Sequence, residues 1–361
     1  MNHQNTVVLI PSLEPDDRLP RYVGDLLAAG FGTVVVVDDG SSAAYQPIFD
    51  GMAQQNGCVV LHHDVNRGKG VALKTGYAWI KEHRADCTGV ITADADGQHA
   101  VKDCLHLSEL LAEGKRALYL GSRDFNLPHV PKKSRHGNHI TSAVFSAFYG
   151  VYLPDTQTGL RAFRREELDF MLGVDGERYE YEMKVLIAAS RDKLPMVPVT
   201  IETIYENNNE GSHFHPLRDS WRIYKVILGE FLRYIASSLI CFFIDYGLAN
   251  LLAYELLPLI GMQPGDGVIT ASGYLARLVS SVVNFSINRA FVFQLKSGTK
   301  QAAIRYALLC VVIITLSNLG VMALEFIRLP YWLAKLLCDT ALYFLSYRVQ
   351  RSWVFQEGKH A

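Results

Sequence analysis

Acidic side chains gather where two apolar runs of the sequence stop. The segment DADGQH at residues 94–99 follows a strand-like run at residues 88–93. Carboxylates at positions i and i+2 after a strand can point into one site, where a hard divalent cation and diphosphate oxygens would satisfy them. A helix N-cap is the alternative, but two acids with Gln98 and His99 exceed what a cap needs. The segment therefore predicts a metal site that neutralises a nucleotide diphosphate.

Two further segments carry polar groups suited to a nucleotide. DDGS at residues 38–41 ends a run of four valines, and a carboxylate there can accept from a base N–H or from ribose hydroxyls; a turn is the alternative. NRGKG at residues 66–70 opens a helix with two glycines and two cations, which suits phosphate or nucleotide contact. It lacks P-loop spacing and a Ser or Thr after Gly-Lys, so we exclude an NTPase.

A basic loop follows the fifth strand-like run. Arg123 and Arg135 flank this loop, which also holds Lys132, Lys133 and a proline. Arginine forks suit phosphate, and such a loop can close over a substrate; a solvated loop is the alternative. Further on, DTQTGLR at residues 155–161 reads as a tight polar turn, and two glutamates at residues 180 and 182 begin an amphipathic helix.

The elements that must position these residues alternate between strand and helix. We predict strands at residues 6–10, 33–37, 58–61, 88–93 and 117–120, and helices at residues 19–29 and 70–83. This alternation predicts an α/β domain with a mostly parallel, doubly wound sheet. Ligands of such sheets bind beyond the carboxyl ends of the strands. The acidic turn, DADGQH and Gly121-Ser122-Arg123 all fall at that edge.

The last third of the chain is far more apolar. Spans are predicted at residues 231–252, 268–291, 302–327 and 331–349, each near the length needed to cross a bilayer. Just before them, Leu217, Trp221 and Tyr224 share one helical face, opposite arginines, as in a helix that lies in the membrane interface; an ordinary surface helix is the alternative. We expect an α/β domain at 1–215, an interfacial helix at 216–229 and a four-helix transmembrane domain at 230–356.

Charge suggests how the chain sits in its membrane. The connector at residues 254–267 has no Lys or Arg, whereas the opposite ends of the spans are rich in both. The positive-inside rule then places the α/β domain and both termini in the cytosol, in a multi-pass protein of the plasma or inner membrane. The first twelve residues look like a strand rather than a signal peptide. With 35 basic and 36 acidic residues, we expect no nucleic-acid partner.

The membrane part contains an internal repeat. NRAFVFQ at residues 288–294 matches QRSWVFQ at 350–356, and Arg-Tyr at 233–234 matches Arg-Tyr at 305–306, so we expect two parallel hairpins. Counting twelve residues, about 18 Å of helix, from these arginines predicts a polar layer past mid-bilayer. Charge at that depth either fixes packing as an ion pair or lines a path for a lipid head group. The layer comprises Asp245, Arg277, Ser317 and Asp339, with Lys335 one turn further out.

Taken in order, VVVVDDGSS, NRGKGVALKTGY, DADGQH, GSR and DTQTGLRAF resemble the dolichyl-phosphate-mannose synthase group of the family-two glycosyltransferases, over residues 5–215. Residues 228–356 resemble the GtrA family of four-span proteins through the RY and NRAFVF patterns. The first resemblance implies a GT-A fold and a metal-dependent, inverting transfer of a hexose from a UDP- or GDP-sugar to undecaprenyl or dolichyl phosphate. The second implies an anchor, and leaves open that it helps the lipid-linked sugar to cross the membrane.

The resemblance also assigns roles to residues. Mg²⁺ or Mn²⁺ falls to Asp94, Asp96 and Gln98. The expected catalytic residues are Asp96, Arg123, Arg135 and Asp155. Arg123 and Arg135 match arginines that hold acceptor phosphate, with Ser122 beside them, and Asp155 orients the acceptor or an arginine. Many relatives carry Asn-Glu after the first strand, where this chain has SLEPD at residues 12–16. The expected nucleotide-sugar site comprises Pro11, Glu14, Asp38, Asp39, Asn66, Lys69, Asp94 and Ala95.

Two other functions stay open. A processive polysaccharide synthase would carry QxxRW on an interfacial helix, and QRSW at residues 350–353 mimics it with the wrong spacing at the end of a span. A non-enzymatic lipid-sugar flippase with a nucleotide-sugar sensor would not need a complete acidic metal motif. The expected partners are therefore a nucleotide-sugar donor, polyprenyl phosphate and the membrane, and the sequence leaves open a homo-oligomer.

Overall fold

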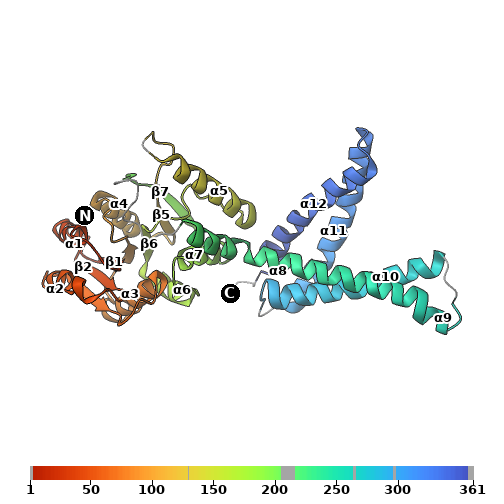
Figure 1. Cartoon of the computed structure of the whole chain (residues 1–361), viewed down its shortest axis with the longest axis horizontal. Helices are drawn as coiled ribbons and strands as arrows, with labels where there is room; N and C mark the ends of the chain where they lie inside the picture. The colour runs from red at the N-terminus through yellow and green to blue at the C-terminus, as the bar shows by residue number, and fades with distance from the viewer. Residues whose placement is uncertain (1–2, 129, 205–215, 263–265, 296–297, 357–361) are drawn as a thin grey trace. The chain divides into compact units, whose positions relative to one another are not determined.

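The computed structural model describes residues 3–128, 130–204, 216–262, 266–295 and 298–356. The chain divides into two compact units, Met1–Ile227 and Leu228–Ala361. The described part of the first unit contains a seven-stranded sheet in the order β3-β2-β1-β4-β6-β5-β7 (Figure 1). Its strands are β1 (Thr6–Ser12), β2 (Thr33–Asp38), β3 (Cys58–His62), β4 (Gly89–Thr92), β5 (Leu118–Ser122), β6 (Arg161–Arg164) and β7 (Met196–Thr200).

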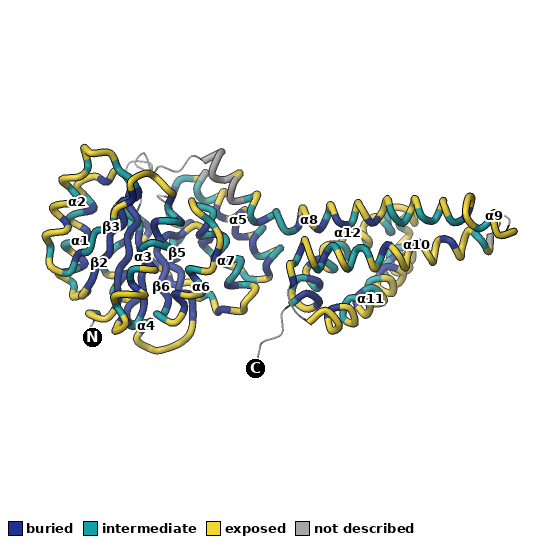
Figure 2. Tube along the Cα trace, turned by 90° about the horizontal axis from the view of Figure 1, so that it is seen from below, coloured by how far each residue is buried: buried dark blue, intermediate teal, exposed yellow. Residues whose placement is uncertain are grey.

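The sheet is mostly parallel, as predicted. β1 pairs in parallel with β2 and β4, β2 with β3, and β5 with β7. Only β6 among the described strands runs antiparallel, between β4 and β5. All residues of β1 and β2 are buried, because both faces of such a sheet are covered and a continuous run of apolar, β-branched residues suits that position. Figure 2 shows these strands as the buried centre of the unit.

Helices flank the sheet and bury its faces. Val8, Ile10 and Val36 of the strands pack in one cluster with Leu26 and Phe49 of the helices, and none of the five is exposed. Each such side chain stabilises the fold by roughly 1.5–3 kcal/mol relative to an exposed one. The helices are α1 (Arg18–Ala28), α2 (Gln46–Ala53), α3 (Lys69–His83), α4 (Val101–Ala112), α5 (Lys132–Tyr149), α6 (Leu168–Gly173) and α7 (Glu180–Arg191), with short turns η1 (Ala43–Tyr45) and η2 (Arg165–Glu167).

This topology brings the candidate residues to one edge. Ser12 at the end of β1 pairs with Asp38 at the end of β2, so Asp39 begins the next loop. β4 ends at Thr92, two residues before Asp94, and β5 ends at Ser122. Because β5 is antiparallel to β6 and β6 to β4, β4 and β5 end at the same edge. The predicted gathering of the motifs beyond the strand ends is therefore present.

The second unit is helical. Each of the four predicted spans corresponds to a helix, and three segments, Tyr224–Leu259, Gly267–Val292 and Thr299–Phe326, are long and apolar enough to cross a membrane. The helix of the fourth predicted span, at residues 331–349, carries three charges in 19 residues, so that it crosses a membrane stays a prediction. The helices and their π-helical turns are α8 (Pro216–Asn250) with η4 (Leu251–Leu256) and α9 (Leu257–Leu259), α10 (Asp266–Ile287) with η5 (Asn288–Val292), α11 (Thr299–Phe326), and α12 (Tyr331–Val349) with η6 (Gln350–Val354).

The segment at 216–229, expected as a separate interfacial helix, is the first part of α8. That helix runs without a break from Pro216 to Asn250, and the division between the two units falls inside it, after Ile227. No residue within α8 breaks the helix, because its only proline is the first residue, Pro216. Its position in the membrane interface stays a prediction.

The internal repeat is visible in the fold. η5 and η6 are both π-helical turns, closed by equivalent hydrogen bonds of 2.8 Å from Phe293 N to Asn288 O and from Phe355 N to Gln350 O. The equivalent residues also touch each other. Asn288 Nδ2 donates to Gln350 Oε1 at 3.0 Å, and the rings of Phe293 and Phe355 stack 5.0 Å apart. Contacts between matched residues are what a pseudo-twofold relation between repeats produces.

The predicted polar layer forms two contacts, one in each hairpin. Between α8 and α10, Arg277 Nη2 lies 3.1 Å from Asp245 Oδ2, and Ser280 Oγ donates to Asp245 Oδ1 at 3.1 Å. Between α11 and α12, Ser317 Oγ donates to Asp339 Oδ1 at 2.7 Å. Lys335 Nζ donates to Ser317 Oγ at 2.8 Å and to Asp339 Oδ1 at 3.1 Å. In the described ranges no hydrogen bond or ion pair joins the two groups.

Candidate active site

The carboxylate of Asp39 holds the NRGKG loop against the end of β2. Its Oδ1 accepts the backbone N–H of Arg67 at 3.0 Å, and its Oδ2 accepts that of Gly68 at 2.7 Å. Gly68 has a φ of 100°, and a Cβ there would lie 2.6 Å from the carbonyl oxygen of Glu177, so this position requires glycine. Behind the carboxylate, His63 Nδ1 lies 2.8 Å from Asp39 Oδ1. The two predicted nucleotide segments thus form one structure.

The other predicted nucleotide residues lie at or just beyond the ends of β1, β2 and β4, apart from Asn66 in the loop itself. Asp38 accepts the backbone N–H of Ser41 at 2.8 Å and lies 3.0 Å from His62 Nδ1. Glu14 has a φ of 49°, and its backbone N–H donates to Ser41 Oγ at 2.8 Å. The side chain of Asn66 accepts from Arg178 Nη1 at 3.4 Å. Pro11 is buried within β1, paired with Val37 of β2, and Ala95 is half-buried between the two carboxylates of DADGQH.

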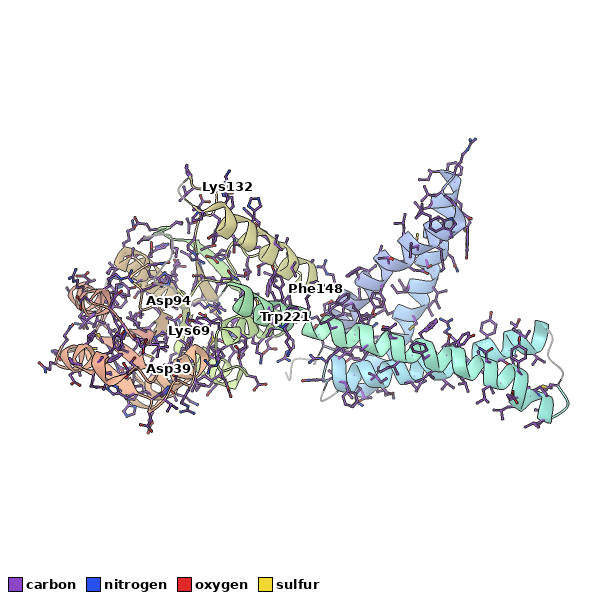
Figure 3. The ribbon with its side chains drawn as sticks, viewed as in Figure 1. Asp39, Lys69, Asp94, Lys132, Phe148 and Trp221 are labelled. Carbon is purple, nitrogen blue, oxygen red and sulfur yellow. The ribbon has the colours of Figure 1, made fainter. Side chains whose placement is uncertain are left out.

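Lys69 links the NRGKG loop to DADGQH. Its Nζ lies 2.7 Å from Asp94 Oδ1 and 3.0 Å from Glu182 Oε2. His99 Nε2 lies 3.2 Å from the other oxygen, Asp94 Oδ2. Figure 3 shows Asp39, Lys69 and Asp94 in one region of the first unit. The sequence noted Glu182 at the head of a helix but gave it no role, because nothing in a linear pattern pairs it with a lysine 113 residues earlier.

Asp94 and Lys69 keep their charges at physiological pH. Burial alone would raise the pKa of Asp94, but the Lys69 ammonium, and then His99, outweigh it and hold that pKa far below its usual range. Burial would likewise lower the pKa of Lys69, yet the charges of Asp94 and Glu182 raise it above the usual value. The Lys69 ammonium and the Asp94 carboxylate therefore hold each other in their charged forms.

Asp96 has the donor chemistry of a metal ligand. Its Oδ1 accepts the backbone N–H of Gln98 at 3.1 Å. Burial, and then the charge of Asp94, raise the pKa of Asp96, so a cation here would relieve the crowding of like charges. The described residues contain no group of three His, Cys, Asp or Glu side chains arranged for a metal. One or two carboxylates completed by substrate phosphates are the usual Mg²⁺ site, and Asp94 and Asp96 fit that pattern.

Arg123 is oriented by a buried carboxylate. Its Nε lies 2.7 Å from Asp155 Oδ2 and its Nη2 3.2 Å from Asp155 Oδ1, while the Asp155 side chain is 0% exposed. The backbone N–H of Gln157 donates to Asp155 Oδ1 at 3.0 Å, and Arg123 also lies over the ring of Phe125 at 5.1 Å. A two-point pair of this kind fixes the plane of a guanidinium. Of the two roles expected for Asp155, the structure shows contact with an arginine.

Arg135 ties down the loop after β5. Its Nε donates to the carbonyl oxygen of Phe125 at 2.7 Å, and its Nη2 to that of Leu127 at 2.9 Å. Contact of Arg135 with an acceptor phosphate stays a prediction, and the structure adds a loop-holding role to it. Ser122 Oγ and Ser12 Oγ, at the ends of β5 and β1, are buried without a hydrogen-bond partner in the part of the chain that is described.

Comparisons with known proteins agree with this division of the chain. Residues 7–170 match the family model described as glycosyl transferase family 2, and residues 233–355 match the one described as GtrA/DPMS, transmembrane domain. An uncharacterized protein of Methanocaldococcus jannaschii is 33% identical over 210 residues, which cover 57% of this chain and 84% of that protein.

Two further proteins are similar to the first unit. The UDP-N-acetylglucosamine–dolichyl-phosphate N-acetylglucosaminyltransferase of Methanococcus voltae is 28% identical over 215 residues, or 55% of this chain and 85% of that enzyme. The crystal structure of glucosyl-3-phosphoglycerate synthase from Mycobacterium tuberculosis, with Mn²⁺, UDP and phosphoglyceric acid, aligns with a TM-score of 0.45 and 16% identity. The alignment covers 63% of this chain and 78% of the synthase chain.

Proposed function

Because the chain belongs to glycosyl transferase family 2 and carries a GtrA/DPMS transmembrane domain, we propose that it transfers a hexose from a UDP- or GDP-sugar to a polyprenyl phosphate. One observation carries the proposal most: the Asp94–Lys69–Glu182 cluster and the Arg123–Asp155 pair both follow strands that end at one edge of the sheet. The M. voltae relative, named for a dolichyl-phosphate acceptor, supports the acceptor class.

The proposed donor lies along the loops that Asp39 holds together. Asp39 binds the nucleoside, with its carboxylate already positioned by Arg67, Gly68 and His63. Lys69 then lies where a diphosphate would gain an ammonium partner. The residues that would hold Mg²⁺ or Mn²⁺ are Asp94, Asp96 and Gln98, and the bound ion would neutralise the charge of the leaving nucleoside diphosphate.

The acceptor needs positioning more than activation. A phosphate monoester is largely dianionic near neutral pH, so it is a nucleophile without a side-chain base. Arg123, held in one plane by Asp155, orients that phosphate for attack on the anomeric carbon opposite the leaving group. Attack from the opposite face inverts the configuration, so an α-linked donor gives a β-linked product.

We place the catalytic unit and both ends of the membrane domain in the cytosol. The basic residues at the Arg-Tyr and NRAFVF ends of the helices, against none in the connector at residues 254–267, support this orientation. A donor made in the cytosol then meets the acceptor at the membrane surface. In this proposal the GtrA/DPMS domain anchors the enzyme, and translocation of its product is a further activity of that domain.

A transfer assay tests the proposal directly. The purified chain in detergent is given undecaprenyl phosphate, Mg²⁺ or Mn²⁺ and a panel of UDP- and GDP-sugars, and release of the nucleoside diphosphate is followed. We expect release that needs the lipid, is abolished by EDTA and occurs with one donor. No release with any donor from folded protein would overturn the polyprenyl-phosphate assignment.

A pair of variants separates chemistry from folding. Asp96→Asn should abolish release and weaken Mn²⁺ binding measured by electron paramagnetic resonance, while Asp50→Asn, an exposed acid on α2, should change neither. Full turnover by Asp96→Asn would overturn the metal role of Asp96, whereas a wild-type chain without turnover would favour a flippase with a sensing domain. The polysaccharide-synthase alternative rests on QRSW, whose spacing is wrong and whose Gln350 accepts a hydrogen bond from its repeat partner Asn288.

A further inference from the structure

The two hairpins of the membrane unit contact each other through matched aromatic residues. The first hairpin is formed by α8 and α10 and ends in η5, and the second is formed by α11 and α12 and ends in η6. The rings of Tyr234 and Tyr347 lie 5.3 Å apart. The matching rings, those of Tyr306 and Phe285, lie 5.4 Å apart. A place in one hairpin can therefore be compared with the matching place in the other.

An ion pair joins the hairpins beside these rings. Arg351 Nε, in η6, lies 3.0 Å from Glu230 Oε1, in α8, and the two side chains are only 10% and 19% exposed. The hydroxyl of Tyr347 donates to the same carboxylate oxygen at 3.3 Å. A buried charge is stable where it is paired and hydrogen-bonded. At this place the second hairpin supplies an arginine, and the first supplies the anion that it needs.

The matching place in the other half has the arginine without the anion. Arg289 is the arginine of NRAFVFQ, but the position that matches Glu230, three residues before Arg-Tyr, is Ala302. The position that matches Tyr347, four residues before the arginine, is Phe285, which has no hydroxyl. Ala302 is 2% exposed and packs in an apolar cluster. Neither a methyl nor a phenyl group can accept a conventional hydrogen bond from a guanidinium.

The guanidinium of Arg289 has no partner among the described residues. Its Nε is buried without a hydrogen-bond acceptor, and within the described ranges no ion pair or ring contact engages the group. Arg305, at the start of the second hairpin, is different. Its Nη1 donates to the carbonyl oxygen of Trp353 at 2.8 Å, and its guanidinium lies 5.5 Å from the centre of that ring. Arg289 therefore has donors for an anion that the described part of the chain does not provide.

Arg289 lies near the level of lipid phosphates. It is three residues from the end of Gly267–Val292, one of the segments long and apolar enough to cross a membrane, so it is about 5 Å from that end. Lipid head groups extend roughly 5–7 Å beyond each side of the hydrocarbon core, and long basic side chains near helix ends reach towards this layer. The anions abundant there are phosphate groups, which the planar fork of an arginine binds through two hydrogen bonds.

We propose that Arg289 binds the phosphate group of a membrane lipid, which takes the place that the Glu230 carboxylate takes beside Arg351. The site is the junction of η5 with the first turn of α11, where Ala302 lies. One junction between the hairpins is thus completed by a carboxylate of the protein, and the other by a lipid. The inference concerns the membrane unit alone and goes beyond the proposed transfer of a sugar.

Lipid binding to the purified full chain tests this inference without any donor sugar. Phosphatidylglycerol and undecaprenyl phosphate are titrated separately into the protein in detergent, and retained lipid is counted by native mass spectrometry. We expect Arg289→Gln to bind at least one of them about tenfold more weakly, a change of about 1.4 kcal/mol. Arg289→Lys should lose less, since it keeps the charge. Arg305→Gln removes the same charge from the second hairpin and should bind like the wild type.

The pattern of losses decides the outcome and names the lipid. A loss confined to phosphatidylglycerol assigns the site to bilayer lipid, and a loss confined to undecaprenyl phosphate assigns it to the polyprenyl lipid. A loss with both means that the phosphate alone is recognised. Unchanged affinity of Arg289→Gln for both lipids overturns the inference. An equal loss in Arg305→Gln also overturns it, because the effect would then be a general attraction between charges.

A substitution at Ala302 tests where the phosphate lies. Ala302→Glu places a carboxylate where the first hairpin has Glu230, so it should pair with Arg289 and lower the lipid affinity about tenfold. Ala302→Gln adds a side chain of the same size without the charge and should lower it much less. Wild-type affinity in Ala302→Glu would mean that Arg289 does not face this position, and would overturn the placement. Thermal unfolding of each variant is measured first, and the Arg289 variants carry the test if the Ala302 variants do not fold.

Discussion

Gly159 and Asp94 lie so close that a Cβ at position 159 would overlap the Asp94 carboxylate. A Cβ added to Gly159 would lie 2.2 Å from Asp94 Oδ2, and the carbonyl oxygen of Gly159 accepts from Thr92 Oγ1 at 2.8 Å. The Asp94 carboxylate cannot swing away cheaply, because Lys69 and His99 hold its two oxygens. The motif DTQTGLRAF therefore shapes the wall against which DADGQH is set.

Gly159→Ala should impair the site more than the fold. The added methyl must displace a carboxylate that two partners hold, so we expect kcat/KM for transfer to fall at least about tenfold. Gly173→Ala is the matched control, because nothing lies within 4 Å of a Cβ there. Both rates are measured with thermal unfolding of the same samples. Wild-type kinetics in Gly159→Ala would mean that Asp94 moves without consequence.

Glu182→Gln should weaken divalent-metal binding. The change removes one of the two carboxylates that share the Lys69 ammonium, so Lys69 neutralises Asp94 more fully and the site becomes less negative. We expect a Mn²⁺ dissociation constant about five- to tenfold higher, read by electron paramagnetic resonance with UDP present. Glu180→Gln, on the same helix, keeps an acceptor for the N–H groups of Glu177 and Arg178 and serves as control. Equal affinities in the two variants would count against this arrangement.

His63→Phe should weaken donor binding and leave the rate of the chemical step nearly unchanged. His63 is buried between Asp39 and the hydroxyl of Thr75, which lies 2.9 Å from its Nε2. Loss of this hydrogen-bonded support costs about 1–3 kcal/mol, so stability falls and the Asp39 carboxylate is less well fixed. We expect KM for the nucleotide sugar to rise about tenfold with kcat nearly unchanged, and His106→Phe, an exposed histidine, to match the wild type. A fall in kcat alone would contradict this role.

Cys58 should make the first unit less stable at high pH. Burial raises the pKa of the Cys58 thiol to about 11, above its value of 9.0 in the unfolded chain. The proton is therefore bound more tightly in the folded state, and this contribution is complete below pH 9 and is lost as pH rises towards 11. Two pH units correspond to about 2.7 kcal/mol. The free energy of urea unfolding is measured at pH 8 and pH 11, and it should fall less between the two for Cys58→Ala than for the wild type. Equal falls in the two proteins would refute the role of the Cys58 thiol.

The Asp245–Arg277 pair should show strong coupling. Either Asp245→Asn or Arg277→Gln leaves one charge in the membrane segment without its partner 3.1 Å away. We expect each single variant to lower the unfolding temperature in lipid, and the double variant to recover most of the loss, a coupling of about 1–3 kcal/mol. Thermal unfolding of the four proteins in nanodiscs closes the cycle. Additive losses would mean that the pair contributes nothing.

Sequence reasoning reached the parts of the fold that repeat a simple pattern. Valine-rich β2 and the strands β1, β3, β4 and β5 appear near their predicted residues because buried parallel strands are continuously apolar. β6 and β7 were missed because RAFR carries two arginines in four residues and MVPVT contains a proline, so neither looks like a strand until its neighbours exist. Antiparallel β6 is a consequence of tertiary pairing.

The site was predictable in its motifs and not in its contacts. DADGQH, DDGS and NRGKG were located because the edge of a parallel sheet gathers strand ends. That Lys69 pairs with Glu182, or that Arg135 holds carbonyl groups of its own loop, depends on how α7 and the loop after β5 pack. In the membrane part the depth count singled out Asp245 and Arg277, and the structure shows them in contact across two helices. That these residues share one layer within the bilayer stays a prediction.

The contact between Asn288 and Gln350 also says something about ancestry. A side-chain amide both donates and accepts, so it can pair with an identical amide across a twofold axis. Asn288 and Gln350 hold matching places in the two hairpins, and Asn288 Nδ2 donates to Gln350 Oε1, while Gln350 Nε2 donates to Tyr234 and Ser346 instead. Duplication and fusion of a gene for a single hairpin accounts for this pairing. The two side chains share the amide group and differ by one methylene in length.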